Sequence, residues 1–290
     1  MVSPLKLRPP QQRGHAEPHG VTLDFGPLDP RRPLALALTG WLRFGGGMAN
    51  IAASRDPDIP FPFPKLEAET ATGWVALDLT AGSPCGKTKT IVIDLEGKLP
   101  AGTRRLRLGA GFEIHWDRIA LFEKAGENDT RITRMAPDRS DLHWRGYSEF
   151  VNLPWTQPLT PDYDKARAWP DWRITPSGWC TRYGEVDELL AHRDGGLVLL
   201  NGGDELTLSF AAASAPPKPE GTSRTFFLFS VGWDKDADFH VVRGDRVGPL
   251  PWEGMDDQQY GTQERPPHPG DALNQRYNTR WVGPLAQIRK

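Results

Sequence analysis

The chain has 290 residues, including 30 glycines, 28 prolines and 11 tryptophans, and a formal net charge of −2 at pH 7. This length can form one large β domain or two smaller ones. The balanced charge argues against nucleic acid or an anionic membrane as a partner, and no apolar run has the roughly 18 residues of a membrane span. The glycine and proline content predicts many short strands, tight turns and little helix.

The first half predicts a β-sandwich or jelly roll over residues 21–124, preceded by an extended lead-in at 1–20. Alternation of Ile91, Ile93 and Leu95 with polar residues is typical of a half-buried strand. Similar strand-like runs occur at 21–25, 34–44, 74–79, 88–99 and 104–124. The four prolines of 55–65 indicate a rigid loop, and the three glycines at 45–47 indicate a turn or a bulge.

Residues 125–254 predict a second β-rich region with one short helix near 185–193. In that helix Val186, Leu189 and Leu190 share one face, and acidic residues occupy the first turn. The run at 197–210 predicts a hairpin around Asn201-Gly202-Gly203, and TFFLFSVGW at 225–233 predicts a strongly β strand. An irregular C-terminal arm over 255–290 completes the chain. The predicted fold class is therefore mostly β, a sandwich or jelly roll followed by a second β-rich half.

Four tryptophans on a proline-rich stretch are the principal candidates for ligand binding. They are Trp155, Trp169, Trp172 and Trp179. Rings held at fixed angles can stack on sugar faces or clasp a polyproline-like peptide. The alternative is that these rings fill the open end of the sandwich, because loops rich in proline need apolar anchors. Exposed, coplanar rings would favour a glycan, and buried rings would favour a structural role.

A cluster of aspartates and two histidines are the candidates for metal or acid–base chemistry. Asp234, Asp236 and Asp238 alternate and can converge on calcium, although the usual loop signature is incomplete; the alternative is a solvated acidic turn. His115, with Asp117 beside it, and His143 can each act as a general base or as half of a metal site. The alternative for the first is a buried Trp116 with an Asp–Arg pair at the rim.

No constellation for nucleophilic catalysis emerges, and the sequence predicts a protein that is not an enzyme. A Gly-x-Ser-x-Gly elbow is absent, and neither Cys85 nor Cys180 has a histidine as neighbour. The two cysteines leave open whether they form a disulfide or remain free thiols. No cofactor is expected apart from calcium at the acidic turn.

Nine phrases in chain order resemble the C-terminal module of bacterial exported proteins that carry FG-GAP (VCBS) repeats, UnbV-type segments or tetratricopeptide repeats. They are LTGWLRF, KTIVIDLEGKLP, LRLGAGFEIHWDRI, DLHWRGYSEF, TRYGEVDELL, GDELTLSF, RTFFLFSVGWDKDAD, PLPWEGM and YNTRW, and they run from about residue 34 to residue 281. The resemblance implies a galactose-binding-like sandwich in the first half and a periplasmic or cell-surface location. The upstream repeats of that family are missing from this chain.

The leading functional prediction is a binding or structural module that acts through protein contacts in an exported assembly. Its partners would be other protein subunits or the remainder of a longer exported protein. The predicted interface anchors are aromatic residues of the C-terminal region, Trp252, Tyr260, Tyr277 and Trp281. The alternative prediction is a carbohydrate-binding module that uses the tryptophan surface, with or without calcium.

Overall fold

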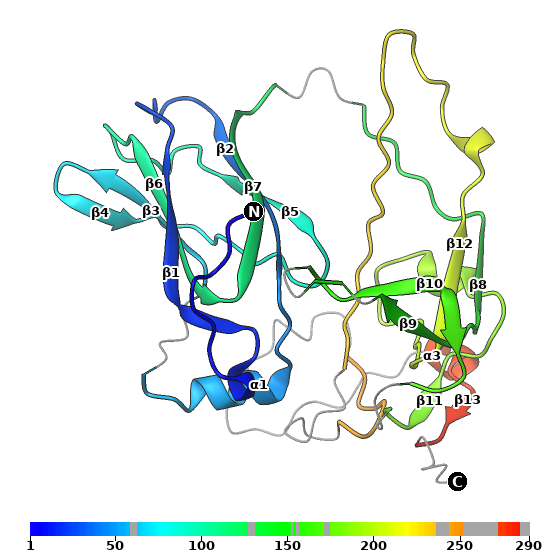
Figure 1. Cartoon of the computed structure of the whole chain (residues 1–290). Helices are drawn as coiled ribbons and strands as arrows, with labels where there is room; N and C mark the ends of the chain where they lie inside the picture. The colour runs from blue at the N-terminus through cyan, green and yellow to red at the C-terminus, as the bar shows by residue number, and fades with distance from the viewer. Residues whose placement is uncertain are drawn as a thin grey trace. The chain divides into compact units, whose positions relative to one another are not determined.

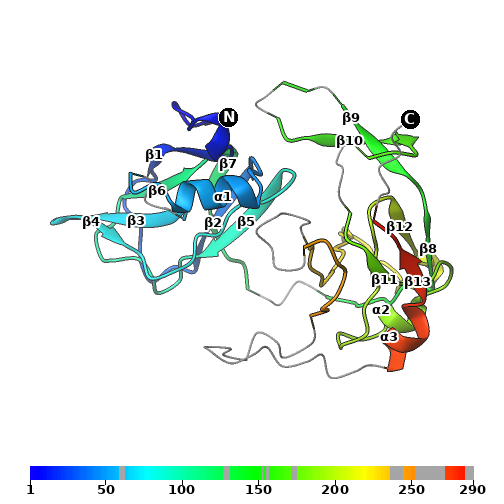
Figure 2. The same cartoon turned by 90° about the horizontal axis from the view of Figure 1, so that it is seen from below.

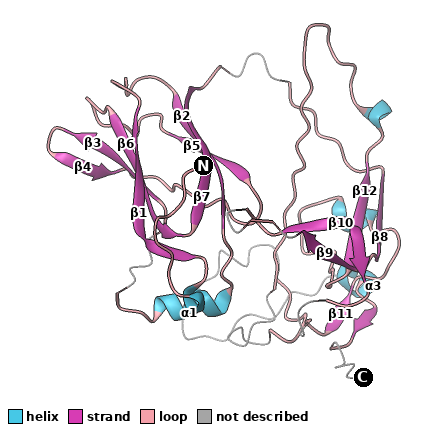
Figure 3. Ribbon diagram, in the orientation of Figure 1, coloured by secondary structure: helices cyan, strands magenta, loops and turns pink. Residues whose placement is uncertain are grey.

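The computed structural model describes residues 1–58, 63–126, 131–151, 153–154, 157–170, 175–235, 244–251 and 272–284. Figures 1 and 3 show a mostly β chain with short helices, which confirms the predicted fold class. The chain divides into two compact units, residues 1–129 with 150–161 and residues 130–149 with 162–290. No helix among the described residues is long and apolar enough to cross a membrane.

The first unit is a sandwich of two antiparallel sheets (Figure 2). One sheet has the order β1 (His15–Asp24), β6 (Arg105–Phe112), β3 (Lys65–Thr70) and β4 (Gly73–Ala76). The other has the order β5 (Lys89–Asp94), β2 (Leu34–Leu42) and β7 (Ile114–Glu123). Alternate residues of both sheets face one core, which includes Leu36, Leu38, Leu66, Leu106 and Ile114. The run expected at 104–124 is thus two strands, separated at Glu113.

The expected lead-in at 1–20 belongs largely to this sandwich. Strand β1 already begins at His15, and Val2 forms a bridge with Trp116 through two backbone hydrogen bonds of 2.6 and 2.8 Å. Leu7 forms a second bridge with Ala16. Because a segment with few apolar residues can still satisfy its backbone at a sheet edge, its composition gave no sign of this pairing.

The glycine run at 45–47 ends in an α-helix that the sequence did not predict. Helix α1 (Gly47–Ser54) follows it and lies against the 3₁₀ turn η1 (Pro10–Gln12) at one end of the sandwich (Figures 1 and 2). A β-carbon on Gly45 would lie 2.0 Å from the carbonyl oxygen of Arg13. Glycine is required there because two backbone segments cross in contact.

The second unit is built from two-stranded antiparallel sheets and short helices. Strand β8 (Arg139–Trp144) pairs with β12 (Asp204–Ser209), and β11 (Gly178–Cys180) pairs with β13 (Arg280–Val282). Strands β9 (Tyr147–Val151) and β10 (Thr160–Arg167) form a further pair, of which residues 147–149 and 162–167 belong to this unit. The helices are α2 (Asp187–Leu190), the 3₁₀ turn η3 (Ala212–Ser214) and α3 (Ala272–Tyr277). A small core contains Leu142, Val186, Leu189 and Tyr277.

The predicted helix at 185–193 is present only as the four residues of α2, although Val186 and Leu189 are buried as expected. The prediction of a hairpin at 197–210 is wrong for its first strand, because residues 197–200 are not a strand. The turn forms, with the Asp204 amide donating to the carbonyl of Asn201 at 3.0 Å, but β12 pairs with β8. Residues 197–199 instead hydrogen-bond Thr181 and Asn274, which explains the difference.

The strand predicted at 225–233 is also wrong, because this segment is an exposed irregular stretch that Figure 3 draws as loop. Its sequence has strong β propensity, but a strand also requires a neighbouring sheet edge. Such an edge does not reach the segment within the described part of the chain.

Candidate functional site

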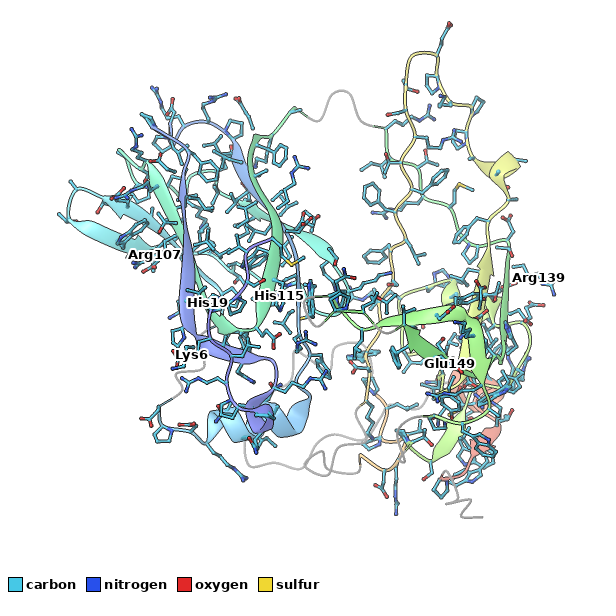
Figure 4. All side chains as sticks on the ribbon, in the orientation of Figure 1. Lys6, His19, Arg107, His115, Arg139 and Glu149 are labelled. Carbon is cyan, nitrogen blue, oxygen red and sulfur yellow. The ribbon has the colours of Figure 1, made fainter. Side chains whose placement is uncertain are left out.

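A buried polar chain crosses the first unit beneath the N-terminal segment, beside the labelled His115 in Figure 4. The Ser3 Oγ lies 2.9 Å from Nδ1 of His115, whose Nε2 lies 3.1 Å from Oε1 of Glu113. Arg43 donates from Nε to the same carboxylate oxygen at 2.6 Å. His115 has no exposed surface, and its ring stacks on that of Trp41 at 4.5 Å. His115 was a candidate from the sequence, whereas Ser3, 112 residues away, and Glu113 were not.

The charge of Glu113 sets the direction of its hydrogen bond with His115. Burial opposes its ionisation, but the hydrogen bonds from His115 and Arg43, together with the charge of Arg43, outweigh this effect and lower its pKa below the ordinary value. At neutral pH the carboxylate is ionised and can only accept, so it accepts from Nε2–H of His115, while Nδ1 of the ring lies against the Ser3 hydroxyl.

The order of these contacts, serine to histidine to carboxylate, resembles that of a serine with a histidine base, but the enclosure of the ring favours a structural role. A nucleophile needs space for a substrate at its oxygen and donors for the developing negative charge. Here His115 is wholly buried and covered by Trp41, and the backbone of Val2 is bonded to Trp116. The chain of contacts therefore fastens Val2 and Ser3 to β7.

The stabilising effect of the Glu113 carboxylate should disappear in acid. Because its folded pKa lies below the ordinary value of 4.5, the folded protein holds this proton less tightly than the unfolded chain does. Its stabilisation is therefore present above that value and is lost as the pH falls through the folded pKa. We expect the difference in melting temperature between the wild type and Glu113→Gln to shrink as the pH falls from about 6 to about 3. A difference that stays constant over this range would contradict the assignment.

In the second unit, two exposed tryptophans lie directly opposite each other across a strand pair. Trp179 of β11 is paired in register with Trp281 of β13, and the ring centroids are 5.2 Å apart at an interplanar angle of 72°. The two residues are 55% and 59% exposed. Both strands have only three residues, and the flanking Gly178 and Cys180 are buried, so the alternation of the strand directs Trp179 outward.

A buried carboxylate holds the strands behind this pair. Asp204 accepts hydrogen bonds from the Tyr183 hydroxyl at 2.8 Å, from Nη2 of Arg280 at 2.5 Å and from the backbone amide of Asn201 at 2.7 Å. Arg280 also lies over the Tyr183 ring at 4.2 Å. Burial, followed by the hydrogen bond to Asp204 and its charge, raises the pKa of Tyr183 to about 12. Since Arg280 precedes Trp281 on β13, this cluster fixes the strand that carries Trp281.

The structure brings together one member of each predicted aromatic set. Trp179 was expected to bind a ligand and Trp281 to bind a partner. Trp169 is also exposed, at 58%, but it belongs to neither of the two strands that carry this pair. Tyr277 is a correction: it is 7% exposed, packs in the core and donates from its hydroxyl to Glu188 at 3.0 Å, so it cannot anchor a partner. The remaining predicted aromatics, Trp155, Trp172, Trp252 and Tyr260, lie outside the described residues.

The metal predictions receive no support from the described residues. Asp234 is exposed, while Asp236 and Asp238 lie outside them. Within the described ranges, no group of three or more His, Cys, Asp or Glu side chains can hold an ion. Cys85 is exposed and Cys180 is buried, and both are free thiols.

His115 bonds the carboxylate of Glu113, whereas Asp117 was the carboxylate expected beside it. His143 bonds Asp141 at 3.0 Å through Nδ1 and lies 3.5 Å from Glu205 through Nε2. The interpretation of Trp116 as a core residue is confirmed, since it is 3% exposed. His115 is buried as well, however, because the N-terminal segment covers its face of the strand.

Comparison with family models, with curated proteins and with solved structures finds no match to this chain. The resemblance to the FG-GAP and UnbV-type C-terminal module therefore stays an interpretation of the sequence.

Proposed function

We propose that the chain is a non-catalytic binding module that docks a protein partner on the Trp179–Trp281 pair. The observation that carries the proposal is the exposure of both rings, 55% and 59%, on strands fixed from behind by the Asp204 cluster. Aromatic residues held on rigid backbone are typical anchors of protein interfaces, because they bury a large area and lose little side-chain entropy. The resemblance of the sequence to exported modules supports a periplasmic or cell-surface setting and assembly with other protein subunits.

The angle between the rings favours a protein over a glycan. A flat sugar-binding platform needs coplanar rings that stack on successive sugar faces, but these rings meet edge to face at 72°. Such an arrangement instead presents two apolar ring surfaces at a steep angle to each other, which suits contact with apolar side chains of a partner. Carbohydrate binding remains the alternative, and the proposal includes no cofactor.

The proposal is tested by affinity purification of the tagged full chain from its native source, with bound proteins quantified by mass spectrometry. We expect a defined set of proteins to be enriched on the wild type and reduced at least about tenfold on Trp179→Ala and on Trp281→Ala, since loss of one interface anchor costs about 2 kcal/mol or more. Melting temperatures should change little, because substitutions of exposed side chains usually alter stability by about 0.5 kcal/mol.

Trp169→Ala is the matched control, because Trp169 is equally exposed and is not part of the pair. This variant should retain the same proteins as the wild type. Equal recovery on all three variants would refute the docking site. Binding of the wild type to a glycan array, lost in Trp179→Ala, would establish the carbohydrate alternative instead.

A further inference from the structure

An uncharged apolar segment, residues 225–233, lies exposed in the second unit, where Figure 1 draws it as part of a long golden trace. Its large side chains are 53–90% exposed: Phe226, Phe227, Leu228, Phe229, Val231 and Trp233. Soluble proteins rarely leave such a continuous apolar run in water, and runs of this kind mark surfaces that another molecule covers.

The backbone of residues 225–233, like their side chains, is exposed. Among the described residues, no hydrogen bond uses a backbone amide or carbonyl between Thr225 and Asp234. The segment contains no proline and is dominated by aromatic and β-branched residues, which favour a strand. A chain with free donors and acceptors on both edges can pair with another strand through its main chain.

The sequence of the segment is complementary to itself in the antiparallel direction. If two copies pair about a twofold axis at Phe229, Phe227 lies opposite Val231 and Thr225 lies opposite Trp233. The same register places Arg224 of one copy opposite Asp234 of the other, twice by symmetry. Both residues are exposed, and each lies immediately outside the uncharged run.

We propose that residues 224–234 form a homodimer interface, in which two copies of the segment pair as antiparallel strands. The apolar side chains of the two copies then cover one another, and the Arg224–Asp234 pairs select the antiparallel register over its neighbours. A shift of this register by one residue in either strand would separate the charges and exchange the faces of the strand, so the register is specified by both charge and pattern. The inference stands independently of the docking site at Trp179 and Trp281.

A charge swap tests the interface directly, by analytical ultracentrifugation of the full chain with a chelator present, so that no cation bridges Asp234. The wild type should sediment as a dimer. Arg224→Glu and Asp234→Arg should each weaken association at least about tenfold, because each places like charges opposite one another. The double variant restores opposite charges and should return association to within about threefold of the wild type.

Cysteine cross-linking tests the register in a Cys85→Ser background, which removes the exposed native thiol. Phe229→Cys should form an intermolecular disulfide under mild oxidation, because residue 229 meets itself on the twofold axis. The matched variant Phe226→Cys should not, since its opposite position holds Gly232. A wild-type monomer at all concentrations would overturn the proposal. So would slow hydrogen exchange of the 225–233 amides in a monomer, because the segment would then pair within its own chain.

Discussion

Replacing Asp204 with alanine should destabilise the second unit by about 3 to 5 kcal/mol. The Asp204 side chain is 1% exposed, and the Arg280 side chain that it pairs with is 19% exposed. Truncation would leave this guanidinium largely buried without its carboxylate, and the Tyr183 hydroxyl and the Asn201 amide would lose their acceptor. For a unit of this size the loss corresponds to a fall in melting temperature of roughly 6 to 20 °C.

The effect should extend to the exposed tryptophans, because Arg280 holds the strand that carries Trp281. Trp fluorescence during urea unfolding measures both changes. The control is Asp245→Ala, whose side chain is 72% exposed in a loose pair with Arg246 and should contribute about 0.5 kcal/mol or less. If Asp204→Ala melted like Asp245→Ala, the buried cluster would not support β13.

The second large effect is expected at Glu113, where alanine should destabilise the first unit by a similar 3 to 5 kcal/mol. Its side chain is 3% exposed and pairs with Arg43, which is 14% exposed, and with His115, which is fully buried. Both donors would lose this charged acceptor in the interior, where its replacement by water is costly. The backbone bridge of Val2 to Trp116 should loosen as well, because Ser3 is bonded to the ring that Glu113 orients.

Thermal melting, together with hydrogen exchange at residues 1–8, would measure this effect. Glu123→Ala is the matched control, because Glu123 also forms an ion pair with an arginine, Arg32, but the two side chains are 45% and 55% exposed. Exposed pairs contribute at most about 1 kcal/mol. Equal melting temperatures for the two variants would show that the buried chain does not stabilise the sandwich.

The fold class was predictable because the two-residue period of half-buried strands is a local pattern. The alternation around Ile93 predicted β5, where Ile93 is 4% exposed, and the near-continuous apolar run at 34–44 predicted β2. Tight turns at glycine were predictable as well, because a positive φ, such as that of Gly203, depends on the type of a single residue.

The candidate sites were not predictable in the same way, because their members are far apart in sequence. Ser3 and His115 are 112 residues apart, and Trp179 meets Trp281 across strands that share no local signal. Trp179 was predicted to bind a ligand and Trp281 to bind a partner, on separate grounds, and only the pairing of β11 with β13 placed them on one surface. Tyr277 was equally aromatic, yet α3 directs it into the core.

Residues 225–233 show most clearly what local sequence determines and what tertiary structure determines. By itself the sequence determined that the chain is mostly β and that alternate apolar residues of its strands are buried. It also determined that residues 225–233 prefer an extended backbone. The tertiary structure decided which strands find partners, because pairing depends on the edges that remain after the rest of the chain has packed. In this protein the packing of the chain buried His115 and exposed Trp179 and Trp281. It also left residues 225–233, the most strand-like segment of the second unit, without a neighbouring strand among the described residues.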